Sequence, residues 1–223
     1  FWLRFYRTNP AMAGSARVPS ALWTILRQPK LWGLMATRLL ATPVWWFYVF
    51  WLPDYLGNGR GFSLAEIGMF GWVPFVTVDL GKLIGGRLSD LGIARGYSLT
   101  MARKTVMGAA AVCMAGGLFV VAAETSFAAL AWVSLATFGF GMWSANILAL
   151  HADLFDSSTI ASAVGWTTAA SSVGGAAFTW LIGRVVDSQG YGLVFAMAGS
   201  TALLAFAVLW FAVGTVERRE TLA

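Results

Sequence analysis

Long apolar runs, separated by short polar or glycine-rich breaks, dominate the chain. Each run is close to the length of about 20 mostly apolar residues that a helix needs to cross the hydrocarbon core of a bilayer. No long segment alternates with a period of two, which disfavours a β-barrel. Because a helix pairs all of its backbone groups internally, the pattern predicts an all-α membrane protein built as a bundle of six transmembrane helices. The runs fall near residues 31–52, 65–86, 105–123, 127–150, 158–183 and 191–214.

Composition supports a membrane protein. The chain has 223 residues, of which 58% are hydrophobic and 11% are charged, whereas a soluble domain carries about 25% charged residues. A soluble core of this length has no room for so much apolar surface, so lipid must surround most of it. Cys113 is the only cysteine, which excludes an internal disulfide. The net charge of +5 does not indicate nucleic-acid binding, since the basic residues gather between the apolar runs.

The distribution of Lys and Arg predicts how the helices are oriented. Eleven basic residues lie in the segments on one side of the expected bundle, two lie on the other side, and two lie inside runs. Cytoplasmic segments of membrane proteins carry such an excess, so both ends of the chain are expected in the cytoplasm. The eleven are Arg4, Arg7, Arg17, Arg27, Lys30, Arg87, Arg95, Arg103, Lys104, Arg218 and Arg219, and the two on the other side are Arg60 and Arg184.

The segments that flank the runs complete the expected domain organisation. Residues 1–30 are interpreted as the cytoplasmic end of a preceding helix followed by a central loop, 31–214 as the six-helix unit, and 215–223 as a cytoplasmic tail. The opening stretch FWLRFYRTNP has neither an initiator Met nor the pattern of a signal peptide. We therefore expect the chain to be a piece of a longer protein.

Asp79 and Lys82 stand inside the second run, where charges are rare. They are three residues apart and share one face of a helix, and an isolated charge at the centre of a bilayer costs about 3 kcal/mol. We expect protein or trapped water, rather than hydrocarbon, to shelter them. One interpretation is an internal ion pair near the cytoplasmic end of the span, with Lys82 extending toward the basic loop. The other is a gating or coupling pair that changes partners during a transport cycle.

Arg38 is the charged residue of the first run. A guanidinium can hold a carboxylate through two parallel hydrogen bonds, which makes Arg38 a candidate gating or coupling residue. The alternative is that its side chain extends to the headgroups on the cytoplasmic side, because only about two to three helical turns separate it from Arg27 and Lys30.

Three stretches of the sequence are distinctive when taken together. They are PVWWFYVFWLPDYL at 43–56, GFSLAEIGMFGWVPFVTVDLGKLIGGRLSD at 61–90, and ARK at 102–104. In this combination they resemble the C-terminal half of the major facilitator superfamily, and within it the anion:cation symporter family with its hexuronate and other sugar-acid transporters. The resemblance covers nearly the whole chain and is most specific over 43–104.

The resemblance implies an architecture and a function. Such transporters are built from two six-helix halves that move against each other around a central site, so this chain would be one half of a twelve-helix fold whose N-terminal half is missing. It would carry a small organic anion, expected to be a hexuronate or related sugar acid, across a bacterial inner membrane. The transport would be symport with a cation, expected to be a proton. The missing half would supply most of the residues that bind the carboxylate and carry the proton.

The sequence departs from the family pattern at three positions. GGRLSD resembles the loop signature of the superfamily, which makes Asp90 a candidate gating residue, but Leu91 stands where relatives have Arg. The charge relay of this loop is therefore expected to be weaker or to use Arg95. Thr42 replaces an Asp that many relatives carry, and Lys82 replaces a small residue.

Aromatic residues of the first run are candidate substrate contacts. Pro43 precedes the cluster Trp45-Trp46-Phe47-Tyr48, and further apolar residues follow it. At least one ring should therefore be buried rather than lie at the membrane interface. The resemblance places aromatic residues of this helix at the central cavity, where a sugar ring can stack. Trp46 and Tyr48 are the candidates, and packing against lipid or other helices is the alternative.

Asn146 is the only Asn in any run. A buried amide needs hydrogen bonds, either from a neighbouring helix or from a ligand hydroxyl, and Trp143 lies three residues earlier on the same face. Asn146 and Trp143 are both candidate substrate contacts, with a bond between helices as the alternative for Asn146. His151, beside Asp153 at the end of the run, is expected to cap the helix or form a surface pair rather than to carry a proton.

Small residues fill the fifth run, AVGWTTAASSVGGAAFTW at 163–180. Small faces allow helices to approach closely and to move against each other, and Gly81 and Gly85 of the second run form a similar face. Ser171 and Ser172 are also candidate hydrogen-bond partners of a hydroxylated anion, as the resemblance implies for this helix.

Other classes of function find less support in the sequence. A membrane hydrolase needs a nucleophile with a base, or metal ligands, but the chain has one His, one Cys and neither an HExxH nor a GxSxG motif. No catalytic residue, metal site or cofactor is therefore expected, and no nucleic-acid partner. A channel would show rings of like residues in a symmetric oligomer. Two alternatives stay open: a transporter half for another organic anion, such as an aromatic or dicarboxylic acid, and a structural bundle that transports nothing.

Overall fold

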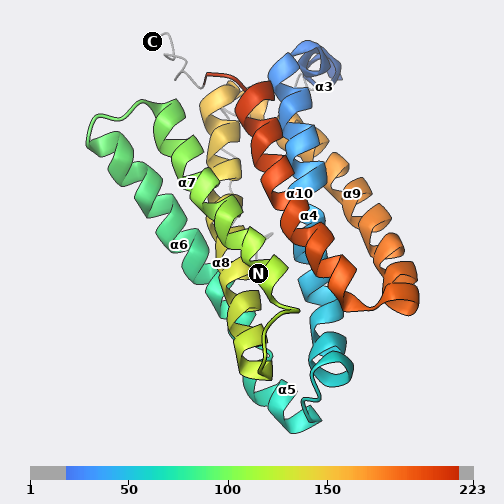
Figure 1. Ribbon diagram of the computed structural model, residues 1–223. Coiled ribbons are helices and arrows are strands. Elements are labelled where there is room, and N and C mark those ends of the chain that lie inside the picture. The colour runs from blue at the N-terminus through green and yellow to red at the C-terminus, as the bar shows by residue number, and fades with distance from the viewer. Residues whose placement is uncertain (1–18, 216–223) are drawn as a thin grey trace, which may run out of the picture.

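The structure of the chain, a computed structural model, describes residues 19–215, which form helices joined by short turns without any strand (Figure 1). This confirms the predicted all-α class, and a long helix lies over each predicted apolar run. Residues 1–18 and 216–223, with most of the predicted entry segment and tail, lie outside the described residues. In chain order the elements are α3 (Pro19–Thr24), the turn η1 (Ile25–Arg27), α4 (Pro29–Asp54), the π-helical turn η2 (Tyr55–Gly59), α5 (Leu64–Phe70), α6 (Val73–Ala94), α7 (Leu99–Ala115), the turn η3 (Gly116–Phe119), α8 (Ser126–Leu154), α9 (Ile160–Gln189) and α10 (Tyr191–Ala212).

Within the described residues, four helical segments are long and apolar enough to cross a membrane. The other two long helices, α4 and α7, fall short for different reasons. α4 has 26 residues, but Arg38 and its many weakly apolar Trp and Tyr side chains lower its mean hydropathy. α7 ends after 17 residues, where the chain tightens into η3. The four segments are Leu64–Ala94, Ser126–Leu154, Ile160–Gln189 and Tyr191–Ala212.

The helices extend beyond the apolar runs because capping side chains set where they begin. Ser63 accepts a hydrogen bond from the backbone N–H of Glu66, and the Glu66 carboxylate accepts the Ser63 N–H, so a capping box starts α5. Ser98 starts α7 by accepting a backbone N–H of its first turn. Arg103 and Lys104 therefore lie on α7 rather than in the loop where the sequence pattern had placed them.

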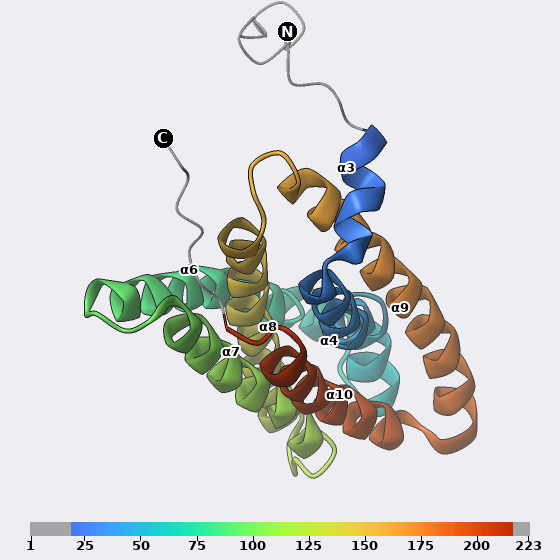
Figure 2. The same ribbon diagram turned by 90° about the horizontal axis from the view of Figure 1, so that it is seen from above.

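The long helices form two groups of three that lie side by side (Figure 2). In the first group α8 packs along both α6 and α7, and in the second α4 packs along both α9 and α10. Contacts of α10 with α7, and of α4 with α8, join the groups. The first group consists of consecutive helices, whereas the second brings α4 together with α9 and α10, so residues far apart in sequence meet there.

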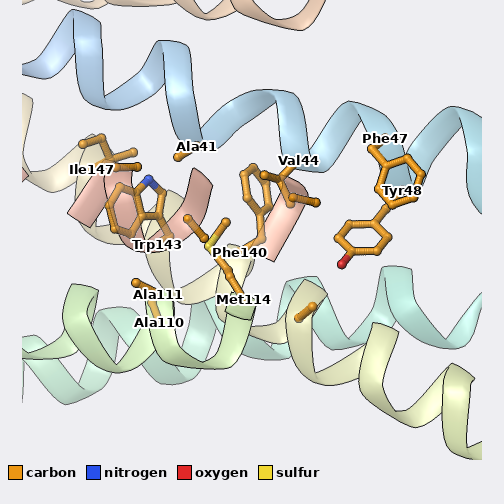
Figure 3. Close-up of a cluster of buried hydrophobic side chains, with 14 of the residues drawn as sticks. Ala41, Val44, Phe47, Tyr48, Ala110, Ala111, Met114, Phe140, Trp143 and Ile147 are labelled. Carbon is orange, nitrogen blue, oxygen red and sulfur yellow. The ribbon is translucent and has the colours of Figure 1, made fainter. Parts of the chain in front are cut away.

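The hydrophobic core lies between α4, α7, α8 and α10, and Figure 3 shows side chains of the first three helices turned toward one another. The faces that point away from this core carry exposed apolar side chains, such as Leu83 on α6 and Phe211 on α10. This arrangement suits helices whose outer faces meet lipid. The labelled core residues are Ala41, Val44, Phe47 and Tyr48 of α4, Ala110, Ala111 and Met114 of α7, and Phe140, Trp143 and Ile147 of α8, each 9% exposed or less.

Glycines bring the backbones of α6 and α8 into direct contact. A Cβ atom at Gly85 would stand 2.5 Å from the Cα of Met142. A Cβ at Gly81 or at Gly141 would collide with a backbone oxygen of the facing helix. This confirms the prediction that Gly81 and Gly85 form a small face for close helix packing.

The contact between α4 and α9 is close for a related reason. A Cβ atom at Gly174 would stand 2.5 Å from the backbone oxygen of Leu39. Pro43, inside α4, has no N–H to donate to that oxygen. The missing helical hydrogen bond leaves the oxygen accessible, and the glycine lets α9 approach it.

Arg60, directly after η2, links η2 to the segment between η3 and α8. Its guanidinium donates to the Tyr55 hydroxyl at 2.6 Å, to the backbone oxygen of Ala123 at 2.8 Å, and to that of Val120. The two backbone acceptors lie in the turn that follows η3. Arg60 therefore holds the end of α4 against the connection between η3 and α8.

The contact between α6 and α8 predicts opposite outcomes for two neighbouring glycines. In Gly81→Ala the new methyl group meets the backbone of Phe138, and overpacking of this kind costs about 1–3 kcal/mol. Gly86 lies on the same helix, and a Cβ added to it would have no atom within 4 Å. Gly86→Ala should therefore be neutral or stabilise the helix by up to about 1 kcal/mol.

Thermal unfolding of the two variants in the same detergent, followed by tryptophan fluorescence, measures this difference. Gly81→Ala should unfold at a clearly lower temperature than Gly86→Ala. Equal unfolding temperatures would show that the close approach of the two helices contributes nothing to stability.

Candidate functional site

A cavity of about 520 Å³ lies between α4 and α9. Its wall combines large aromatic side chains with hydroxyl groups and small residues. Trp46 and Phe50 come from α4, and α9 supplies Ser172, Gly175, Ala176, Thr179 and Trp180. Two residues that the sequence predicted as substrate contacts, Trp46 and Ser172, thus meet in one cavity, although 126 positions separate them in the chain.

The aromatic wall of this cavity is ordered by stacking and by a glycine. The rings of Trp46 and Phe50 are nearly parallel, with centroids 5.6 Å apart. Gly175 makes room for the indole, because a Cβ there would stand 2.7 Å from Trp46 Cδ1. The Ser172 hydroxyl donates to the backbone oxygen of Thr168 at 3.0 Å and keeps its lone pairs free. A flat apolar surface beside hydroxyl groups can hold a sugar ring by stacking and by hydrogen bonds.

Arg38 lies at the upper end of the same contact between α4 and α9. Its Nη1 donates to the Thr167 hydroxyl at 3.1 Å and to the Thr168 hydroxyl at 3.2 Å. The half-buried side chain therefore turns to α9, and its extension to the headgroups stays an untested alternative. Thr168 precedes Ser172 by one helical turn, about 6 Å along the axis, so the guanidinium lies close to the cavity.

His151 belongs to this cluster, contrary to the prediction of a helix cap or surface pair. It is 1% exposed, and its Nε2 lies 2.8 Å from the Thr167 hydroxyl oxygen. Its Nδ1 lies 2.7 Å from the backbone oxygen of Ile147. No sequence signal indicated this contact, because Arg38, Thr167 and His151 come from three helices that meet only in the folded bundle.

Tyr48 and Trp143 lie in the hydrophobic core rather than in the cavity (Figure 3). Their side chains are 1% and 2% exposed, respectively. Tyr48 is two positions from Trp46 on α4, which turns it by about 200° to the opposite side of the helix. Its hydroxyl is buried without a hydrogen-bond partner among the described residues. Their predicted role as substrate contacts has no support in this conformation.

Asn146 joins α8 to α6. Its amide nitrogen donates to the backbone oxygens of Gly85, at 3.1 Å, and of Met142, at 3.0 Å, and its side chain is fully buried. This is the bond between helices that the sequence offered as the alternative to a ligand contact. Ser171 is also buried, unlike its neighbour Ser172, because it faces into the bundle.

Asp79 and Lys82 form the predicted ion pair, with Lys82 Nζ 2.9 Å from Asp79 Oδ1. The expected shelter is absent among the described residues, since 72% of the Asp79 side chain and 48% of the Lys82 side chain are exposed. The reason is the position of Gly81 and Gly85, which turn their own face of α6 toward α8 and leave the charged pair outside that contact.

Asp90 is paired, but with a different arginine from the one expected. Arg103 of α7 donates from Nη1 to Asp90 at 3.2 Å and to Ser89 at 2.7 Å, and from Nε to Asp153 at 3.1 Å. The sequence had suggested Arg95, which lies closer in the chain. Helix α7 carries Arg103 back alongside α6, so this one side chain connects α6, α7 and α8 at their upper ends.

The predicted site residues thus separate into several places. Arg38, Trp46 and Ser172 share the contact between α4 and α9, Asp90 belongs to the arginine cluster of α6, α7 and α8, and the Asp79 and Lys82 pair stands apart. No group of three His, Cys, Asp or Glu side chains that could hold a metal ion occurs in residues 19–215. The aromatic and hydroxyl side chains between α4 and α9 are suited to binding a small polar solute.

Comparison with known proteins places this arrangement in context. Residues 1–179 match the family model described as Major Facilitator Superfamily. The chain is 31% identical over 188 residues to the hexuronate transporter of Escherichia coli (strain K12), covering 83% of this chain and 43% of that protein. It is 39% identical over 114 residues to the galacturonate transporter of Dickeya chrysanthemi, covering 48% of this chain and 32% of that protein.

A third relative extends over a longer part of the chain. The D-galactonate transporter of Escherichia coli O6:H1 is 26% identical over 199 residues, which cover 88% of this chain and 45% of that protein. The chain spans less than half the length of these relatives. The family model and the hexuronate transporter each cover most of the chain, so the chain belongs to the Major Facilitator Superfamily.

Proposed function

We propose that this chain is the C-terminal half of a twelve-helix transporter that carries a hexuronate or related sugar acid by cation symport. The relatives named for hexuronate, galacturonate and galactonate transport support the substrate class. The match to less than half of their length supports the assignment as one half. The cation is proposed to be a proton, and the two halves are proposed to alternate access to a site between them.

The observation that carries the substrate proposal is the cavity between α4 and α9. Its volume of about 520 Å³ falls within the range of about 300–1,000 Å³ that small-molecule sites occupy. Trp46 and Phe50 would stack on the ring of the sugar acid, and Ser172 and Thr179 would bond its hydroxyl groups. Arg38 would approach its carboxylate from the upper end.

The exposure of Asp79 and Lys82 on α6 is consistent with one half of a transporter seen without the other half. Under this proposal, the N-terminal half or lipid headgroups cover Asp79 and Lys82, which supports the interpretation of the pair as a gating or coupling element. The excess of Lys and Arg supports a cytoplasmic location for the upper end in Figure 1. Asp90, with 68% of its side chain exposed, would then face the cytoplasmic loops, where it could exchange partners as the halves move.

The assignment as one half has a direct test in the gene that encodes this chain. The sequence upstream should encode six more apolar spans in the same reading frame. A start codon at the beginning of this chain, with a stop codon before it, would contradict the proposal without any biochemical experiment.

Transport by the intact protein tests the substrate class. Proteoliposomes should take up labelled D-galacturonate in response to an inward proton gradient, and unlabelled D-glucuronate and D-galactonate should compete, because all three present a carboxylate and several hydroxyl groups. Neutral D-galactose, which lacks the carboxylate, is the control and should compete poorly. Competition only by an aromatic or dicarboxylic acid would favour the alternative anion, and no uptake of any anion would favour the structural bundle.

Two substitutions in the cavity test its role in the same assay. Trp46→Ala removes a stacking surface and should raise KM about tenfold, which corresponds to about 1.4 kcal/mol. Ser172→Ala removes one hydrogen-bonding group worth about 0.5–1.5 kcal/mol and should have a smaller effect of the same kind. Phe211→Ala is the control, because Phe211 is 82% exposed on α10 and does not line the cavity. If Trp46→Ala had the same KM as the wild type, the cavity would not be the site that binds the transported substrate.

A further inference from the structure

We propose that His151 is a proton-binding site coupled to Arg38 through the Thr167 hydroxyl, so that capture of a carboxylate by Arg38 favours protonation of His151. This inference rests on the proposed function for its carboxylate ligand. It assigns one proton site of the symport to this half of the protein, on a residue that the sequence pattern had set aside.

The three side chains form a chain of hydrogen bonds across three helices. Arg38 Nη1 of α4 lies 3.1 Å from the Thr167 Oγ1 of α9, and that oxygen lies 2.8 Å from the His151 Nε2 of α8. His151 Nδ1 continues the chain to the backbone oxygen of Ile147 at 2.7 Å. A buried imidazole joined to a guanidinium by one shared hydroxyl cannot change its charge without affecting that guanidinium.

The direction of each hydrogen bond in the neutral state follows from the groups involved. The oxygen of Ile147 can only accept, so Nδ1 of His151 carries a proton and donates it. The Nε2 atom of neutral His151 is then an acceptor, and the Thr167 hydroxyl donates to it. The same hydroxyl oxygen accepts from Arg38. Each of these hydrogen bonds then has one donor and one acceptor, so the neutral imidazole is compatible with the bound guanidinium.

Protonation of His151 reverses the central bond. Nε2 then donates to Thr167 Oγ1, and the hydroxyl proton must turn to the backbone oxygen of Val164, 3.1 Å away. The Thr167 oxygen would now accept from two cations at once. Like charges in this position repel each other, so a protonated His151 disfavours the bond between Arg38 and Thr167, and a bound Arg38 disfavours the proton.

The other charged groups around His151 do not change this balance. Arg38 is the charge that α4 presents to it, and α9 presents hydroxyl groups. On α8 itself the nearest charge is Asp153, whose carboxylate is bound by Arg103 of α7. Asp90 of α6 is paired with the same arginine. The guanidinium of Arg38 is therefore the charge whose position sets the protonation of His151.

Arg38 is placed to exchange its hydroxyl partners for a carboxylate. Among the described residues only its Nη1 donates hydrogen bonds, which leaves Nε and Nη2 for a second partner. A carboxylate at the upper end of the cavity, one helical turn from Ser172, would bind these two nitrogens and neutralise the guanidinium. The repulsion on His151 would fall, and Nε2 could accept a proton from water.

This linkage is reciprocal by thermodynamic necessity. If the bound anion favours the proton on His151, then the proton favours the anion by the same factor. The anion should therefore bind more tightly as the pH falls through the range in which histidine titrates. Coupled binding of an anion and a proton in this sense is what symport requires.

The first experiment follows the protonation of His151 without any substrate. His151 is the only histidine of the chain, so isotope-labelled histidine reports its imidazole by NMR, and a spectrum of His151→Gln identifies its signal in the intact protein. Arg38→Gln keeps hydrogen-bond donors but removes the charge. We expect His151 to take up its proton at a higher pH in Arg38→Gln than in the wild type. The same titration in both proteins would overturn the inference.

The second experiment measures the coupling to D-galacturonate. Calorimetry of the intact protein at pH 6 and pH 8, in buffers of different ionisation enthalpy, counts the protons taken up with the ligand. The wild type should bind at least about fivefold more tightly at pH 6 and should take up protons. His151→Gln keeps an amide that can bond Thr167 but does not titrate, so it should take up fewer protons and show a weaker pH dependence.

Two neighbouring threonines supply a matched control. Thr167→Val removes the hydroxyl that joins Arg38 to His151, whereas Thr168→Val removes a hydroxyl that binds Arg38 alone. Proton uptake should fall in Thr167→Val and persist in Thr168→Val. This comparison also tests the coupling between Arg38 and His151 if His151→Gln does not fold. Equal uptake in the two variants, or wild-type uptake in His151→Gln, would overturn the inference. Absence of D-galacturonate binding to the wild type would instead overturn the proposed function, and the NMR titration would still test the coupling.

Discussion

Polar groups between the helices of this bundle depend on one another for hydrogen bonds, because neither lipid nor a packed apolar core supplies any. Asn146 donates its amide protons to the backbones of α6 and α8. Arg103 gathers two carboxylates and a hydroxyl at the upper ends of three helices. Each of these polar side chains therefore lies at a contact between helices, and its hydrogen bonds hold those helices together.

Glycines allow the backbones to approach closely in the contact between α6 and α8 and in the contact between α4 and α9. Between α6 and α8, Gly81, Gly85 and Gly141 meet the backbone of the facing helix, and Asn146 donates a hydrogen bond to the backbone oxygen of Gly85. In the contact between α4 and α9, Gly174 meets the backbone of Leu39. Next to it, Gly175 accommodates the indole of Trp46, and both residues line the cavity. One pair of helices is thus suited to act as a rigid support and the other to hold a solute.

The sequence predicted the parts of this structure that depend on local pattern. The apolar runs located the helices, and the positions of Gly81 and Gly85 indicated a close contact on α6. The pattern also selected Trp46 and Ser172, although it could not show that they face each other. It gave Tyr48 the same weight as Trp46, because both are aromatic and lie close together. Only the packing of the folded helices, which places Tyr48 beside Phe195 of α10, separates a core residue from a cavity residue.

The charged groups were the least predictable, because their partners come from other helices. With Leu91 in place of the usual Arg, the charge relay at Asp90 was expected to be weaker or to use Arg95, whereas the folded bundle brings Arg103 to Asp90. His151 was assigned to the surface because it stands near the end of an apolar run, whereas α9 covers it and supplies Thr167. Sequence spacing predicts contacts within one helix, and these residues depend on contacts between helices.

The contrast between Arg38 and Arg103 explains why one is suited to a ligand and the other to structure. Arg103 is held by two carboxylates, so its charge is already neutralised and moving it would leave those carboxylates unpaired. Arg38 is held by two hydroxyl groups and by no carboxylate among the described residues. Its half-buried charge lacks a counter-ion, and an anionic ligand would provide one. The distribution of counter-charge, together with the nearby cavity, therefore identifies Arg38 as the arginine whose partner can change during function.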